Sequence, residues 1–268
     1  MMTRLLPALC GVLVLSAAAG ASPVVEAEFA TIDWAALPAA AATPQSTLAV
    51  TPEVLASIDH AYLNRHQGQN LQESNASLRA LITQNPSNPD IAWRLARGLN
   101  AWGVRQSTRD EKLHVFAEGE TILNTALSNN PNSALNHYWL ARIYGAQNEI
   151  KRTLGLAKAM RRELETAIQL DPKLAGAHHI YGELLRQLPW IVGGDKQKAV
   201  AEIEQAVRLT PNDSALYPAL AEAYLAVKDK ARAIETARKT FTVTPDDPGG
   251  YDGDVKDARE FLKKLGAN

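Results

Sequence analysis

The stretch SALYPALAEAYLAVKDKARAIETARKTFTVTP, residues 214–245, decides the fold class of this chain. From Tyr217 to Tyr224, large and small apolar residues recur at offsets 0, 3, 4 and 7, the spacing of one helix face. A turn is expected around Lys228-Asp229. A second helix with small inward residues follows, and Pro245 ends it because proline cannot continue a helix. The stretch therefore predicts a pair of antiparallel helices.

Working outward, the same pattern recurs upstream in residues 177–211, 136–172 and 91–131, and a weaker copy ends at Pro86. The prolines that end these copies lie 45, 41, 39 and 34 residues apart. The last interval equals the period of tetratricopeptide repeat (TPR) proteins. In the longer copies, the extra residues are expected between the first and the second helix. No helix pair can bury its apolar face alone, so neighbouring pairs are expected to stack into a solenoid.

Three segments resemble the regulator of microtubule dynamics family. They are WRLAR at 93–97, HYWLAR at 137–142 and IQLDP at 168–172. The resemblance spans roughly residues 89–245, and it implies a divergent TPR fold with elongated repeats. The helix-pair plan and the loop Gly193-Gly194-Asp195 are also similar to the T components of TRAP transporters. We therefore expect an all-α, TPR-like α-solenoid of about five helix pairs over residues 51–268, with a C-terminal capping helix at 252–265.

The N-terminus predicts export. Arg4 precedes an apolar run at 5–19 that is short for a membrane span, and Ala19-Gly20-Ala21 fits a cleavage site. We assign 1–21 to a signal peptide and the Ala- and Pro-rich segment 22–50 to a flexible leader, which predicts a periplasmic or secreted protein without stable membrane insertion after cleavage. The alternative is a membrane anchor formed by an uncleaved N-terminal segment. The one cysteine, Cys10, lies inside the run, so the processed chain has no thiolate chemistry.

Composition and motifs argue against several classes of function. The formal net charge of the 268 residues is −1, which offers no large positive field for nucleic acid. The sequence has no GxSxG, HExxH or P-loop pattern, so we expect no enzymatic activity and no cofactor. The histidines lack metal-ligand spacing; His137 and His178 occupy matching repeat positions and are expected to pack between helices. No metal site is predicted.

In a solenoid of this kind, the first helices of the pairs line the concave surface. Aligning the repeats gives the inward positions: Trp93, Arg97, Asn100, Tyr138, Arg142, His179, Glu183, Arg186 and Glu222. One interpretation is a binding groove with aromatic walls, in which arginines hold a carboxylate or a backbone carbonyl. The other is that the aromatic residues are core and the charges form ion pairs on a solvated face. The sequence leaves both open.

Two functions remain from these residues. The leading hypothesis is an exported, non-catalytic scaffold that binds a protein or peptide through its concave surface. The alternative is a solute-handling or transporter-associated component with a small-ligand pocket, roofed by the loops around Trp102 and Trp190. Trp190-Ile191-Val192 is expected to tuck under its loop, and Asp195 to cap the next helix. The oligomeric state is left open.

Overall fold

The computed structural model describes residues 50–245 and 248–267, so the predicted signal peptide and nearly all of the predicted leader lie outside the described residues. Within the described ranges, the chain forms eleven α-helices, two short 3-10 turns and no strand. The helices are α1 (Pro52–Leu63), α2 (Asn70–Gln84), α3 (Pro89–Gly103), α4 (Arg109–Asn129), α5 (Ala134–Lys151), α6 (Leu154–Leu170), α7 (Ala175–Gln187), α8 (Lys196–Leu209), α9 (Leu216–Ala226), α10 (Lys230–Lys239) and α11 (Pro248–Lys264). The all-α prediction is confirmed.

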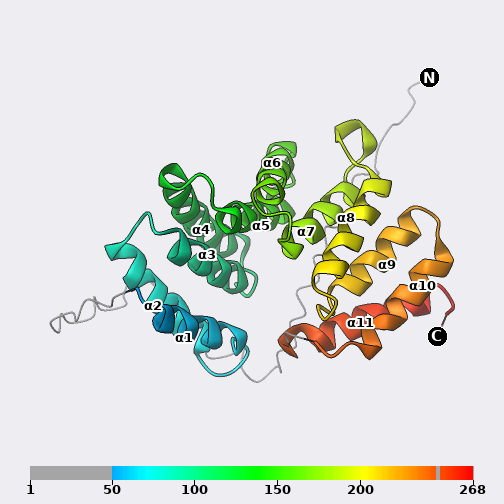
Figure 1. The fold of residues 1–268 in the computed structure, drawn as a ribbon, viewed down its shortest axis with the longest axis horizontal. Helices are drawn as coiled ribbons and strands as arrows, with labels where there is room; N and C mark the ends of the chain where they lie inside the picture. Colours follow the sequence, from blue (N-terminus) through cyan, green and yellow to red (C-terminus); the bar gives the residue numbers. More distant parts are fainter. Residues whose placement is uncertain (1–49, 246–247, 268) are drawn as a thin grey trace.

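The helices pair in chain order and follow one another around an arch (Figure 1). The first helices of the pairs, α3, α5, α7 and α9, lie toward the inside of the arch, and α4, α6 and α10 lie toward the outside (Figure 1). Each first helix contacts its own partner most and also the first helix of the next pair. This is the predicted solenoid, in which each pair buries its apolar face against its neighbours.

Four turns between successive pairs share one backbone form. The residue before the proline, which caps the preceding helix, has φ between −138° and −133° at Asn85, Asn130, Asp171 and Thr210. Proline disfavours the helical region for the residue before it, and all four residues have left that region, with ψ between 64° and 93°. The proline turns therefore end the second helix of each pair and reverse the chain at equivalent points.

The surplus length of the longer repeats is not all in the loop between the paired helices. In the second pair, only residues 104–108 separate α3 from α4, which has 21 residues, and the prediction was also wrong for the third pair. There, Arg152 and Thr153 alone separate α5 from α6, whose 18 and 17 residues hold the surplus. Arg152 adopts a left-handed conformation with φ 53°, and Thr153 accepts a hydrogen bond from the N–H of Leu156, so a two-residue turn suffices. The fourth pair instead places its surplus in the loop 188–195.

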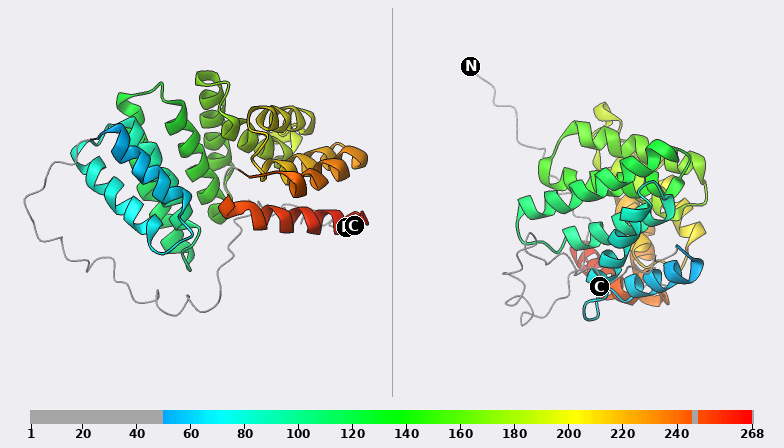
Figure 2. Two further views of the ribbon diagram at one scale, coloured as in Figure 1. Left: turned by 60° about the horizontal axis from the view of Figure 1, so that its bottom comes forward. Right: turned by 90° about the vertical axis from the view of Figure 1, so that its left-hand side faces the viewer.

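The core follows the small residues that the repeats share. Ala96, Ala141 and Ala221 are fully buried, and Gly182 is buried at the equivalent place on α7. A Cβ at Gly182 would lie 2.5 Å from Cγ1 of Ile203 on α8, so glycine is required for the close approach of α7 and α8. The apolar face of α11 then covers the last pair, and Figure 2 shows α11 running along the end of the stack. The capping helix is confirmed.

Candidate functional site

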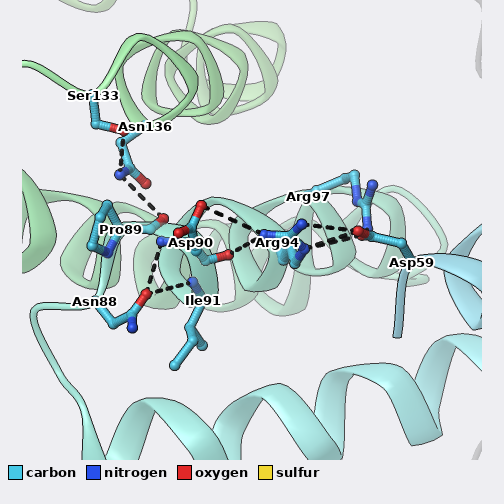
Figure 3. A network of polar contacts seen from close by, with 9 residues as sticks. All are labelled: Asp59, Asn88, Pro89, Asp90, Ile91, Arg94, Arg97, Ser133 and Asn136. Carbon is cyan, nitrogen blue, oxygen red and sulfur yellow. Dashed lines mark hydrogen bonds and ion pairs between the residues drawn. The ribbon is translucent and has the colours of Figure 1, made fainter. Parts of the chain in front are cut away.

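The α3 end of the inner face carries two arginines that share one carboxylate. Arg94 and Arg97 both reach Asp59 on α1, at 3.0 and 2.5 Å (Figure 3). The guanidinium of Arg97 also stacks over the ring of Tyr62 at 3.9 Å, and that of Arg94 over the ring of Trp93 at 4.2 Å. The predicted residues Trp93 and Arg97 therefore belong to a network that ties α1 to α3.

Hydrogen bonds to the turns fix α3 and α5 beside this network. Asn88 caps α3 by accepting from the N–H groups of Asp90 and Ile91 (Figure 3). Asn136 of α5 donates to the carbonyl of Pro89. Asn100, also predicted for the site, is partly buried near the far end of α3.

Arg142, in the middle of α5, differs from the other inner-face arginines because it has no acidic partner. Its Nη1 donates to the hydroxyl of Tyr138 at 2.9 Å, and its guanidinium lies 5.2 Å from the ring centre of Trp139. Among the described residues, no carboxylate lies within ion-pairing distance of Arg142. Its Nε and Nη2 donate to none of the described residues. Arg142 is thus a cation held in place by Tyr138, with two donor atoms that have no partner among the described residues.

The nearest acidic influence on Arg142 comes from Glu149, two turns farther along α5. Burial raises the pKa of Glu149 to about 7, against the opposing charges of Arg142 and Lys112. A carboxyl group with this pKa is only partly ionised at neutral pH. It therefore leaves much of the positive charge of Arg142 uncompensated.

On α7, the inner face changes from positive to negative. His179 is partly buried, and burial lowers its pKa, so the ring is neutral at pH 7. Glu183 accepts from Arg186 at 2.7 Å, and the same guanidinium reaches Glu222 of α9 at 2.8 Å. The two arginines of α3 are matched by Asp59 and Asp90, so the excess positive charge of the face lies at Arg142 on α5 and the excess negative charge at α7 and α9. This separation would favour one orientation of a polar ligand.

Sequence reasoning missed Asp59 and Tyr62 of α1. Both lie one turn apart on that helix, and this spacing was the available signal. The apolar pattern of the first repeat was too weak to align its first helix with the others. Arg97 is ion-paired because Asp59 lies beside it, whereas Arg142 has no such carboxylate among the described residues.

The matching histidines lie behind the inner face, as predicted. His137 contacts Glu163 through Nδ1 at 2.6 Å and the carbonyl of Pro131 through Nε2 at 2.8 Å. His178 repeats the arrangement with Glu202 at 2.7 Å and the carbonyl of Pro172 at 3.0 Å. Both rings therefore tie a proline turn to the next pair.

The loop predictions had different outcomes. Asp195 caps α8 by accepting from the N–H groups of Gln197 and Lys198, as expected. The side chain of Trp190 is not tucked in, because 84% of it is exposed, and so is 74% of Ile191. Trp190 therefore roofs no enclosed small-ligand pocket, and the solute-handling alternative has no support from this loop.

Comparison with known proteins places this geometry in a family. The family model described as regulator of microtubule dynamics protein 1-3 matches residues 54–189. Regulator of microtubule dynamics protein 1 from Bos taurus is 30% identical over 122 residues, and that from Pongo abelii is 32% identical over 123 residues. Each alignment covers 42% of this chain, and 38% and 39% of those proteins.

A solved structure supports the fold independently. The crystal structure of a thermophilic TPR protein from Thermus thermophilus superposes with a TM-score of 0.58. It is 19% identical, and the match covers 80% of this chain and 97% of that chain. The helix-pair solenoid, the matched segments and the family model agree, and the chain belongs to the regulator of microtubule dynamics family of TPR-like proteins.

Proposed function

We propose that this chain is an exported, non-catalytic scaffold that binds a protein or peptide along the inner face of its solenoid. The observation that carries the proposal is Arg142, a desolvated guanidinium whose charge has no acidic partner among the described residues and whose Nε and Nη2 donate to none of them. A desolvated cation is retained at a cost in stability, and a ligand carboxylate would offset that cost. The fold is consistent with a protein or peptide partner, because repeat solenoids bind extended chains on their concave surfaces.

The contacts of Arg142 indicate which chemical group a partner would place against it. Tyr138 fixes the guanidinium by accepting from Nη1, which leaves the other edge of the fork for a planar acceptor. We therefore propose that the partner places a carboxylate, from a chain terminus or an acidic side chain, against Arg142. Its basic groups then lie toward Glu183 and Glu222.

Binding of peptides tests the proposal. A random peptide library displayed with free C-termini is selected on the purified chain, and the selected peptides are remade as acids and as amides. Arg142→Ala is expected to weaken their binding by about tenfold or more, because a charged hydrogen-bonding partner is lost. Arg142→Lys is expected to recover part of the loss, since it keeps the charge but not the fork.

The matched control is Arg79→Ala. Arg79 pairs with Glu118 at 2.7 Å between the outer helices α2 and α4, so it removes an arginine away from the inner face. Its binding is expected to equal that of the parent chain. If the selected peptides bind the Arg142→Ala chain with the same affinity as the parent chain, the inner face is not the binding site.

A further inference from the structure

The loop between α7 and α8 holds two large apolar side chains in solvent. Trp190 is 84% exposed and Ile191 is 74% exposed, more than any other large apolar residue among those described. The loop projects beyond the helices it joins, at the top of Figure 1. A contiguous exposed apolar pair of this kind marks a contact site more often than a lone surface leucine does.

The loop is built to hold that position. The N–H of Gly193 donates to the carbonyl of Trp190, and that of Gly194 to the carbonyl of Pro189, each at 3.0 Å. From α6, Arg161 donates to the carbonyl of Gly193 at 3.0 Å. Gly193 adopts φ +93°, and a Cβ at Gly194 would lie 1.8 Å from the carbonyl oxygen of Leu188, so both positions require glycine. The two apolar side chains are therefore presented by an ordered turn.

The surroundings of the tip are basic. Lys196 and Lys198 are exposed in the first turn of α8, where the helix dipole disfavours cations, and Nζ of Lys198 donates to the hydroxyl of Tyr181 at 3.2 Å. The α9–α10 turn carries two more exposed lysines, Lys228 and Lys230.

The acidic groups at these turns do not cancel this charge pattern. The carboxylates of Asp195 and Asp229 accept from the backbone N–H groups of the helices they cap. Glu165 on α6 is paired with Arg161 at 2.9 Å. Four exposed lysines stand against the two capping carboxylates, and the Arg161–Glu165 pair is neutral, so the two turns carry an excess of positive charge.

We propose that this tip, defined as Trp190 and Ile191 with Lys196, Lys198, Lys228 and Lys230, docks on the surface of an anionic lipid bilayer. Tryptophan favours the interface between water and hydrocarbon, and lysines are attracted to anionic headgroups. Two side chains offer far less area than the roughly 800 Å² per partner of a stable protein interface. They suffice for peripheral binding when basic residues assist. No helix of the described part is long and apolar enough to cross a membrane.

Sedimentation with vesicles tests the proposal independently of the inner face. The purified full chain is mixed with vesicles of phosphatidylcholine alone or with about one third phosphatidylglycerol. All variants share residues 1–49, so any binding by that segment is common to them. We expect Trp190→Ser/Ile191→Ser to lower partitioning into anionic vesicles by about tenfold, and Lys196→Gln/Lys198→Gln by about fivefold per lysine at low salt.

Matched controls and a second readout complete the test. Leu170→Ser and Lys173→Gln remove an exposed apolar residue and an exposed lysine at the turn between α6 and α7, at the other ends of the helices, and are expected to bind like the parent. Hydrogen exchange at 188–195 is expected to slow with anionic vesicles and not with neutral ones. Equal partitioning of the Trp190/Ile191 variant and its parent, or unchanged exchange at 188–195, would overturn the proposal.

Discussion

His137 couples the stability of the solenoid to pH. Its two ring nitrogens face two acceptors, the carboxylate of Glu163 and the carbonyl of Pro131. An imidazole donates from both nitrogens only when it is protonated. Burial opposes that charge, but the hydrogen bonds to Glu163 and Pro131 outweigh it and raise the pKa of His137. Burial likewise acts to raise the pKa of Glu163, and the hydrogen bonds from His137 and Arg162 outweigh it and lower that pKa.

The directions of these two shifts set the pH window. The raised pKa of His137 gives stability that is fully present below the unfolded value of about 6.5, and that is lost as pH rises through the folded value. The lowered pKa of Glu163 gives stability that is present above its unfolded value of about 4.5, and that is lost as pH falls through the folded value. The pair therefore stabilises the fold most between about pH 4.5 and 6.5.

Replacing His137 with glutamine measures this contribution. The variant loses a charged hydrogen bond in a nearly buried site, which is expected to lower the free energy of unfolding by about 2 kcal/mol at about pH 6. Above about pH 8 the neutral ring of the parent keeps one of its two bonds, so the difference is expected to narrow to about 1 kcal/mol. Urea unfolding followed by far-UV circular dichroism across this pH range provides the measurement.

The control is His114→Gln, which removes an exposed histidine from α4 and is expected to change the free energy of unfolding by no more than about 0.5 kcal/mol at any pH. If the difference between the parent and His137→Gln stays constant or grows with pH, His137 is not held as the protonated form. The reasoning from its two acceptors would then be wrong.

Three further predictions concern other parts of the chain. Because burial raises the pKa of Glu149 to about 7, Glu149→Gln is expected to stabilise the fold by about 1 kcal/mol at about pH 8, and urea unfolding should show this gain vanish near pH 4.5. Gly182→Ala is expected to cost about 2 kcal/mol in the same assay, because its Cβ would meet Ile203, whereas Gly155→Ala, with open space around it, is expected to stabilise α6 by about 0.5 kcal/mol. If the chain is exported and cleaved as the sequence predicts, N-terminal sequencing of the protein from the cell envelope will begin at Ser22, and an intact Met1 would contradict this.

The helix pairs could be predicted from sequence because their signals are local. The proline that follows a second helix restricts its own φ and the residue before it, so Pro86, Pro131, Pro172 and Pro211 mark repeat boundaries without any tertiary information. The last second helix, α10, ends at Lys239, ahead of Pro245. The small residue shared by the first helices, from Ala96 to Ala221, marks the closest approach of the paired helices. The capping helix could also be predicted, because the apolar face at 252–265 is a local sequence pattern.

The partners of the inner-face charges could not be predicted, since they depend on how far each first helix lies from the next. Arg97 and Arg142 occupy the same repeat position, yet Asp59 reaches only Arg97. The repeat before Arg142 offers no acidic residue at the corresponding place. The exposure of Trp190 was also missed, because an apolar run predicts burial unless the glycines and Arg161 that hold the loop outward are taken into account.

Arg142 and His137 lie on the same helix, and their opposite roles allow binding and stability to be separated. His137 faces Glu163 of the paired helix, whereas Arg142 faces the inner side with Tyr138. We therefore expect Arg142→Ala to weaken peptide binding by about tenfold or more. The free energy of unfolding should stay within about 0.5 kcal/mol of the parent, or rise slightly, because an uncompensated charge is removed. His137→Gln should lower the free energy of unfolding and leave peptide binding unchanged. If Arg142→Ala destabilised the chain as much as His137→Gln, Arg142 would be a structural residue, and the inner face would lose the one cation that distinguishes it as a binding surface.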